Sequence, residues 1–416
     1  MAIVRPFKSL RPAAGKAAKV ASLPYDVMNR IEAKAMAAGN PDSFLHVVRS
    51  EIGLPDEIGD YDPKVYARAK EVLEQMTADG VLVQDTKPMF YIYRQIMCGR
   101  VQTGLVATVA VDEYLSNDIK KHELTLEVKE QDRINHFDAT DANTEPIFLT
   151  YRENREISKL LNDFIKFNAP TAGFTSEDNI THYTWAIEDD DLNGKLEQLF
   201  AGIDALYIAD GHHRSASAAK VGLKRREQFP DAPADAEFNY FMAVIFPDED
   251  LFIMDYNRIV KDLNGFSAED FTKVLQTGFS VRKMEGKEPL RPKAKAHFGM
   301  YLDGNWYELA AKPELYQNKD PYDRLDVSIL QQNVLSPLLA IEDPRTSKRI
   351  DFVGGIRGLQ ELADRVDAAG GVAFSMYPTT MAELLEIADA EMTMPPKSTW
   401  FEPKLRSGLF IHLLSD

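Results

Sequence analysis

Cysteine is almost absent from the sequence, which has only Cys98 among its 416 residues. One thiol cannot form an intramolecular disulfide, and it cannot supply the several cysteines of a zinc site. Cys98 precedes Gly99 in a predicted turn, and no base lies beside it in the sequence. We therefore exclude a disulfide-stapled fold and expect an inert thiol.

Long apolar runs and targeting signals are also missing. The longest apolar runs, residues 105–111 and 241–246, have the length of a strand and are far shorter than a membrane span. Residues 1–12 contain basic side chains but lack the apolar stretch of a secretory signal. We therefore expect a cytoplasmic protein that has no membrane partner.

Basic residues are outnumbered by acidic ones, with 48 Lys and Arg against 65 Asp and Glu, so the formal net charge is −17. Such a charge repels nucleic acid and anionic membranes at long range. It argues against a non-specific nucleic-acid binder, and it leaves room for a local basic pocket that binds a small anion. The hydrophobic fraction of 44% is sufficient for a large globular core.

Helical and strand patterns alternate along the chain and predict an α+β, or mixed α/β, fold. The predicted helices are 62–79, 155–168, 214–228, 268–277, 358–369 and 380–390. The predicted strands are 89–96, 101–111, 147–151, 182–187, 205–208, 240–246, 295–301, 372–376 and 409–414. Cys98-Gly99 and Asp303-Gly304 are predicted hairpin turns, because such pairs tolerate the positive φ angles of a tight turn.

Domain boundaries are weakly marked in the sequence. We place an N-terminal α/β domain at 1–115, a central domain at 116–260 and a C-terminal α/β domain at 261–416. The last loop and strand, 394–416, are expected to return to the central domain.

The first motif that indicates chemistry is Asp210-Gly211-His212-His213-Arg214, here called the DGHHR motif. It follows a predicted strand and precedes a predicted helix. Gly211 allows a sharp turn, and Arg214 together with the free N–H groups of the helix start would form an anion site. Adjacent His212 and His213 point in different directions, so they are poorly suited to share a metal. The alternative is a helix cap at Asp210 with solvated histidines.

The second motif is the charged stretch 122–133. If it is helical after Thr125, then Thr125, Lys129 and Arg133 lie at i, i+4 and i+8 on one face and could hold phosphates. Glu123 lies just ahead of this row and could act as a base. The alternative, an exposed charged helix, remains open from the sequence.

The third motif is Lys397-Ser398-Thr399, which follows Pro395 and Pro396. An ammonium, two hydroxyls and backbone N–H groups have the composition of a phosphate cradle, although no glycine-rich Walker loop precedes them. A proline-stiffened surface loop is the alternative.

Two shorter segments are weaker candidates. Tyr25 and Asp26 form either the edge of a pocket or a simple turn. Asn257 and Arg258 follow a predicted strand at 251–254, and Arg258 either holds a phosphate or forms a surface ion pair.

Taken in order, these motifs resemble a widespread microbial family of unknown function, and the resemblance covers nearly the whole chain. That family is similar to the free L-serine kinases built on the ParB/sulfiredoxin fold. The likeness to the kinases covers mainly 116–250 and 370–416, and residues 1–115 and 261–370 have no clear counterpart in them. The kinases have a Pro-Lys-Thr-Thr loop where this chain has Ser398 as its third residue.

The resemblance implies a ParB/sulfiredoxin-like catalytic core with additional N-terminal and inserted α/β elements. Glu123 would be the general base on the serine hydroxyl. Asp210, His212, His213 and Arg214 would hold the transferred phosphoryl group and the metal, with Asp210 as a Mg²⁺ ligand. Further phosphate or donor contacts are expected from Gly211, Thr125, Lys129, Arg133, Arg258, Lys397, Ser398 and Thr399, and substrate contacts from Tyr25, Asp26 and Asn257.

The expected reaction is transfer of a phosphoryl group from ATP, ADP or pyrophosphate to free L-serine, giving O-phosphoserine. Mg²⁺ would arrive with the phosphates, as is usual for that ion. We expect small-molecule partners and no nucleic acid, and a homo-oligomer is left open. The hypothesis requires Glu123 to lie near Arg214 and Lys397.

Other functions are weighed against this one. The main alternative is a nucleotide-binding, ParB-like regulator without kinase activity. The net charge of −17 and the lack of a clear helix-turn-helix weigh against DNA as its partner. A sulfiredoxin-like reaction is disfavoured because Cys98 lies outside the DGHHR motif.

Overall fold

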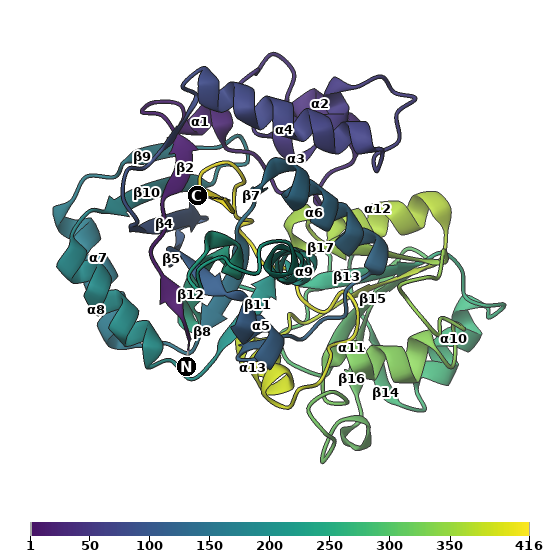
Figure 1. Cartoon of the computed structure of the whole chain (residues 1–416). Helices are drawn as coiled ribbons and strands as arrows, with labels where there is room; N and C mark the ends of the chain where they lie inside the picture. Colours follow the sequence, from purple (N-terminus) through teal and green to yellow (C-terminus); the bar gives the residue numbers. More distant parts are fainter. Residues whose placement is uncertain (1, 416) are drawn as a thin grey trace. The chain divides into compact units, whose positions relative to one another are not determined.

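A computed structural model describes residues 2–415 and confirms the mixed α/β fold, with helices and several sheets (Figure 1). The contacts divide the chain into two compact units. The large unit comprises the residues up to Leu251 and those from Pro403 onward, and the small unit is Phe252–Glu402. The sequence predicts three domains. Strands from the predicted N-terminal and central domains, however, pair within one sheet of the large unit.

The main sheet of the large unit has the strand order β6-β11-β8-β12-β5-β4-β10-β9, and β1 pairs with β5. Most neighbours are antiparallel, whereas β6–β11 and β8–β12 are parallel. The strands are β1 (Val4–Arg5), β4 (Phe90–Met97), β5 (Arg100–Ala110), β6 (Ile119–Lys120), β8 (Ile147–Tyr151), β9 (Ala172–Thr175), β10 (Thr181–Ile187), β11 (Leu206–Asp210) and β12 (Tyr240–Pro247).

A second, smaller sheet in the large unit joins distant parts of the chain. Its order is β3 (Leu82–Gln84), β2 (Ser9–Pro12), β19 (Ile411–Leu413) and β7 (Ala142–Asn143). The last strand, β19, therefore lies between segments from the beginning and the middle of the chain. This pairing holds the residues from Pro403 onward in the large unit.

The helices of the large unit are α1 (Ala17–Val20), α2 (Arg30–Met36), α3 (Leu45–Val48), α4 (Pro63–Ala78), α5 (Val111–Ser116), α6 (Glu127–Thr140), α7 (Arg155–Phe167), α8 (Asp190–Ala201) and α9 (His212–Gln228). Figure 1 shows α7 and α8 side by side, and Lys195 is paired with Glu156 between them at 2.9 Å. Among residues 2–415, no helix combines the length and the apolar character needed to cross a membrane.

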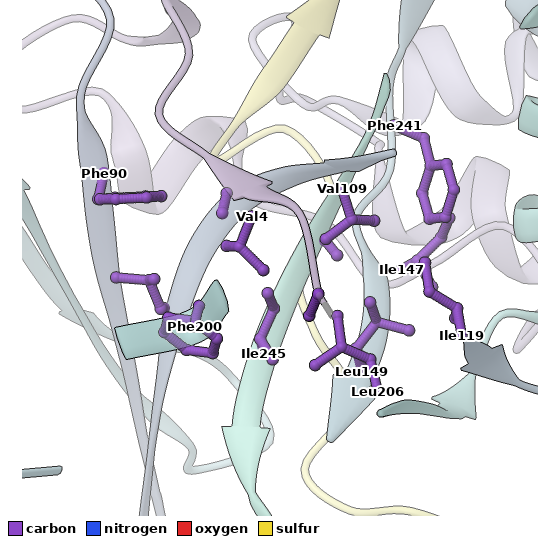
Figure 2. Packing of buried hydrophobic residues seen from close by; sticks show 14 of the residues in the cluster. Val4, Phe90, Val109, Ile119, Ile147, Leu149, Phe200, Leu206, Phe241 and Ile245 are labelled. Atoms are coloured by element: carbon purple, nitrogen blue, oxygen red, sulfur yellow. The ribbon is translucent and has the colours of Figure 1, made fainter. Parts of the chain in front are cut away.

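The core of the large unit lies on one face of its main sheet. Alternate residues of a strand point to the same face, so Val109, Ile245, Leu149 and Leu206, from four different strands, meet in one cluster (Figure 2). Phe200 of α8 packs into the same cluster. Burial of this apolar layer fixes the positions of β8 and β11, and therefore of the loops that follow them.

The small unit is built on a second sheet, with the order β14 (Phe279–Lys283), β16 (Asn305–Ala311), β15 (His297–Leu302), β18 (Val372–Ser375), β13 (Tyr256–Val260) and β17 (Ile350–Gly354). Its helices are α10 (Ala268–Leu275), α11 (Asp326–Leu330), α12 (Gln360–Ala369) and α13 (Met381–Asp389). A π-helix, Gln331–Leu335, continues α11. Buried residues of α12, such as Leu362, pack with Trp306 and Ile259 of the sheet.

Two predicted turns are confirmed. Met97 pairs with Arg100, and the intervening Cys98 and Gly99 have φ angles of 50° and 79°. Leu302 pairs with Asn305 around the Asp303-Gly304 turn, whose φ angles are 49° and 72°. Positive φ at both central residues is the geometry that matches the twist of a two-residue hairpin.

One predicted strand is wrong in position. Residues 251–254 are not a strand; the strand is β13, which starts at Tyr256. The apolar residues 251–254 follow the acidic turn 248–250 that ends β12, and only Ile253 of this segment forms an isolated bridge. Asn257 and Arg258 therefore lie within a buried strand and not in a loop after one.

We expect Leu206→Ala to lower the free energy of unfolding by about 2–5 kcal/mol, because the side chain of Leu206 is fully buried and its removal leaves a cavity. Leu223→Ala is the control, because Leu223 on α9 is 39% exposed and its loss is expected to cost well below half as much. Urea denaturation followed by circular dichroism measures both. Equal costs would contradict the placement of Leu206 in the core.

Candidate functional site

The candidate site lies in the large unit, at the ends of two adjacent parallel strands. Ile119 of β6 pairs with Leu206 of β11, and Lys120 pairs with Tyr207. Parallel neighbours end at the same edge of a sheet, so the residues that follow them are brought together. His122 and Glu123 follow β6, and the DGHHR motif ends β11 and starts α9. Two motifs that are distant in sequence therefore share one edge.

Gly211 makes the change from β11 to α9 possible. The register of β11 against β8 shifts between Ile208 and Asp210, which re-aims the end of the strand. Gly211 then has a φ of +98°, and a Cβ added there would lie 3.1–3.2 Å from atoms of the Arg214 guanidinium. Only glycine fits both the backbone conformation and the close approach of Arg214.

Arg214 is a buried cation beneath the start of α9. Its side chain is 3% exposed, and Nη1 donates to the carbonyl of Pro146 at 2.6 Å. Nη2 lies 3.6 Å from Oδ2 of Asp210. Burial by itself lowers the pKa of Arg214, but the carboxylates of Asp210, Asp26 and Glu145 raise it above its ordinary value. The guanidinium is therefore a permanent positive charge at this edge.

Asp210 is held between two cations. Nζ of Lys404 lies 3.3 Å from its Oδ2, the same oxygen that Arg214 approaches. Although burial alone would raise the pKa of Asp210, Lys404 and Arg214 lower it to about 2. Asp210 is therefore a carboxylate throughout the physiological range and neutralises part of the local positive charge.

Lys404 is a residue of the site that no sequence motif indicates. It lies in the segment that follows the third motif and returns to the large unit. The sequence offers Lys397 and Lys404 close together, and no spacing or periodicity distinguishes them. Only the pairing of β19 places Lys404 beside Asp210.

Glu123 lies beside His212. Oε2 of Glu123 is 3.7 Å from Nδ1 of His212, and the Glu123 side chain is 44% exposed. The backbone N–H of His122 points at Nε2 of His212 at 3.4 Å. Burial lowers the pKa of His212 well below its usual value, so the ring is neutral. Because Nε2 accepts, the proton of the ring is on Nδ1, the nitrogen that faces Glu123.

His122 packs against the ring of His212. Its ring meets that of His212 edge to face, with 4.4 Å between centroids, and burial lowers the pKa of His122 to about 4. Neither ring nitrogen of His122 has a hydrogen-bond partner among residues 2–415. His122 therefore acts here as a packing residue that keeps His212 in place.

His213 holds the loop that carries Glu123. Its Nε2 accepts a hydrogen bond from the backbone N–H of Leu126 at 3.0 Å. Burial lowers the pKa of His213 further than Asp26 and Glu130 raise it, so the neutral, accepting ring is favoured at pH 7. The adjacent histidines thus have separate partners, as their positions in the sequence predict.

The predicted row of Thr125, Lys129 and Arg133 is not one continuous helical face, and its role in holding phosphate stays a prediction. Helix α6 begins at Glu127, so Thr125 precedes it, and its hydroxyl donates to Glu130. Lys129 donates to the Tyr61 hydroxyl at 3.1 Å. Lys129 also lowers the pKa of His213, so its charge acts at the edge of the site.

Arg133 is buried and has its partners inside the protein. Its guanidinium is 2.9 Å from Asp132 and 3.4 Å from Glu145, and it lies 3.9 Å from the centre of the Tyr25 ring. The backbone N–H of Tyr25 donates to Glu145 at 3.0 Å. Tyr25 is therefore a buried anchor for this ion cluster, while Asp26 is exposed and acts electrostatically on His213 and Arg214.

The remaining predicted residues lie in the small unit. Asn257 is fully buried. Its Nδ2 donates to Asp255 at 2.6 Å and its Oδ1 accepts from the backbone N–H of Met376 at 2.9 Å, and its role toward the substrate stays a prediction. The Ser398 hydroxyl donates to Pro395 within its own loop at 2.5 Å. Lys397 is exposed beside it and Thr399 is half-buried.

The hypothesis is therefore met in part by geometry. Glu123 lies at the same edge as His212 and Arg214 within the large unit. Arg258, Lys397, Ser398 and Thr399 belong to the small unit, and their assignment to the phosphate donor stays a prediction.

The residues of the site do not form a metal cage by themselves. Among residues 2–415, no group of three or more His, Cys, Asp or Glu side chains is arranged to hold a metal ion. Asp210, the predicted Mg²⁺ ligand, already has Lys404 and Arg214 at its carboxylate. The donor set does not fit a resident Mg²⁺ ion.

Comparisons with known proteins add a family and distant likenesses. The family model described as "Protein of unknown function (DUF1015)" matches residues 4–328. No curated protein is significantly similar in sequence. Three solved structures are similar to this chain at TM-scores too low to carry an argument. They are a free serine kinase in complex with AMP (TM-score 0.35, 15% identity, covering 71% of this chain and 86% of that one), SbnI with a C-terminal truncation from Staphylococcus aureus (0.39, 12%, 74% and 87%) and a conserved hypothetical protein from Pyrococcus furiosus (0.35, 16%, 74% and 95%).

We expect Asp210→Asn to be less stable than the wild type above pH 4. A pKa lowered from 3.8 to about 2 on folding corresponds to about 2 kcal/mol, present above the unfolded pKa and lost as pH falls through the folded one. The gap should therefore narrow between about pH 4 and pH 2. Urea midpoints from pH 2.5 to 6 measure it, with exposed Asp231→Asn as the control. A difference in urea midpoint between the wild type and Asp210→Asn that does not change with pH would contradict the proposed pairing of Asp210 with Lys404 and Arg214.

Proposed function

We propose from the site itself that this chain is a small-molecule kinase. The chain belongs to the family described as "Protein of unknown function (DUF1015)", and that description states no activity. The proposed reaction transfers a phosphoryl group from a nucleotide or from pyrophosphate to the hydroxyl of free L-serine. The ParB/sulfiredoxin-like core belongs to this proposal, which rests on the motif resemblance. The observation that supports it most is the shared edge where Glu123 meets the DGHHR motif.

The phosphoryl group would lie at the start of α9. The first N–H groups of this 17-residue helix have no partner within the helix, and the helix dipole favours an anion there. Arg214 lies under the same turn with its positive charge, and Gly211 has no side chain, which lets the guanidinium approach the backbone closely. Phosphoryl transfer depends mainly on such positioning and charge stabilisation.

Glu123 would accept the proton of the acceptor hydroxyl. The Oγ–H bond of serine breaks as the Oγ–P bond forms, the bond from phosphorus to the donor oxygen breaks, and the proton passes to the carboxylate of Glu123. Exposure of 44% makes this carboxylate reachable. The Nδ1–H of His212 faces it at 3.7 Å, which orients it without adding a positive charge that would weaken the base.

Mg²⁺ enters the proposal as a companion of the donor phosphates, whose charge it would neutralise. No step is assigned to it here, because the side chains of the site do not form a resident metal cage. Lys404 would keep Asp210 ionised and away from the phosphoryl group, so the net field at the helix start stays positive.

The kinase hypothesis is tested by incubating the protein with Mg²⁺, L-serine and, separately, ATP, ADP or pyrophosphate, and detecting phosphoserine. We expect product with one donor, and Glu123→Gln to lower kcat by about 10²–10⁴-fold, the usual contribution of a general base. Glu127→Gln is the matched control, because Glu127 is exposed in the first turn of α6. Tight nucleotide binding without product would favour the ParB-like regulator.

A second prediction concerns His213 as a positioning residue. His213→Ala removes the acceptor for the Leu126 N–H, so we expect faster hydrogen exchange at residues 123–126 and a lower kcat with little change in KM. His213→Gln should restore part of both, because its Oε1 can accept the same bond. Unchanged exchange together with a lost kcat would show that His213 instead contacts the reacting groups.

A further inference from the structure

The small unit contains a second candidate site, built around Arg258. A cavity of about 260 Å³ is lined by Arg258, Phe352, Leu335, Pro395 and Pro396, among others. All of its lining residues belong to the small unit. The DGHHR motif belongs to the other unit.

Arg258 is buried without a carboxylate partner. Its side chain is 4% exposed. Two of the five N–H groups of a guanidinium have protein acceptors here, the carbonyls of Tyr256 and Lys397. Three N–H groups are left without an acceptor among residues 2–415, and no acidic side chain offsets the charge.

Burial of such a charge is costly unless an anion offsets it. Burial lowers the pKa of Arg258 to about 10, so the guanidinium is still charged at pH 7. The contrast is Arg214, whose neighbours include three carboxylates. A buried, uncompensated cation on the wall of a cavity indicates that the missing partner is a ligand.

The walls of the cavity are rigid. The carbonyl of Lys397, which Arg258 holds at 2.9 Å, belongs to a residue with a φ of +58°. Pro395 and Pro396 precede it and stiffen the same loop. Leu335 comes from the π-helix 331–335, a form of helix that occurs often at functional sites. The guanidinium carbon of Arg258 lies 5.6 Å from the centre of the Phe352 ring.

The rim determines which anions fit. Arg345 is neutralised by Asp343 at 2.8 Å, and the carboxylate of Glu342 accepts from the Ser336 hydroxyl at 2.6 Å. One uncompensated cation with acidic groups at the rim suits a single oxyanion group and disfavours a polyphosphate. The planar fork of an arginine matches two oxygens of a carboxylate or phosphate.

We propose that this cavity, the Arg258 pocket, binds the single oxyanion group, a carboxylate or a phosphate, of a small metabolite. The proposal does not depend on the kinase activity, because it uses residues of the small unit alone. If the Arg258 pocket binds no anion, the assay of Glu123→Gln still tests the kinase proposal. If no phosphoserine forms, the titration still tests the Arg258 pocket.

The test is isothermal titration of the full chain with inorganic phosphate and, separately, with propionate, which distinguishes the two oxyanions. We expect saturable binding of at least one probe, and Arg258→Lys to weaken it by about tenfold, because the ammonium lacks the fork. Arg282→Gln is the control: it removes one positive charge from the same unit, on the exposed strand β14 and outside the pocket.

A second variant and a localised readout guard against misfolding of Arg258→Lys. Arg345→Gln lies on the exposed rim and leaves the carboxylate of Asp343 without its cation, so the added negative charge should weaken anion binding severalfold with the fold intact. Hydrogen exchange of the wild type with the bound probe should slow at 327–335 and 394–398. Absence of saturable binding, protection confined to 206–216, or affinity unchanged in both Arg258→Lys and Arg345→Gln would each overturn the proposal.

Discussion

The parallel pairing of β6 and β11 is the constraint on which the candidate site depends. Without it, Glu123 and the DGHHR motif would be two unrelated charged loops, separated by more than 80 residues of chain. The pairing is short, only two residues on β6, and it is stabilised by what surrounds it. Leu206 and Ile119 are buried in the core of the main sheet, and β8 pairs with the other side of β11.

Charge at this edge is arranged so that Asp210, Arg214 and Lys404 form one ion cluster with two cations and one carboxylate. Arg214 cannot leave its position, because it bonds the carbonyl of Pro146 and lies against Gly211. Asp210 lies between Arg214 and Lys404, so neither cation is buried alone. The neutral histidines add hydrogen bonds and shape to the site but no charge. An acidic protein thereby keeps a small region that attracts anions.

Sequence patterns predict what is local in this structure and miss what depends on the return of the chain. The long helices 63–78, 155–167 and 212–228 and both hairpin turns follow from periodicity and turn chemistry, which act over a few residues. The strand placed at 251–254 fails because a short apolar run has no period of its own. The role of Lys404 could not be predicted, because a strand pairing between residues 9–12 and 411–413 creates its contact. Thr125, Lys129 and Arg133 do not form one helical face, and spacing alone does not show that Thr125 and Arg133 already have acidic partners.

Two of the buried arginines, Arg133 and Arg258, show why partners decide the role of a charge. Arg133 lies between Asp132 and Glu145 and over the ring of Tyr25, so carboxylates inside the protein neutralise its charge. Arg258 has a similar degree of burial but only carbonyl oxygens as partners. A carbonyl dipole offsets much less of a unit charge than a carboxylate does. Under the proposal, an anion that enters the cavity would recover part of the free energy of burying Arg258, whereas Arg133 would gain nothing from one. Burial and charge are similar in the two residues, and what differs is their partners, carboxylates for Arg133 and carbonyls for Arg258.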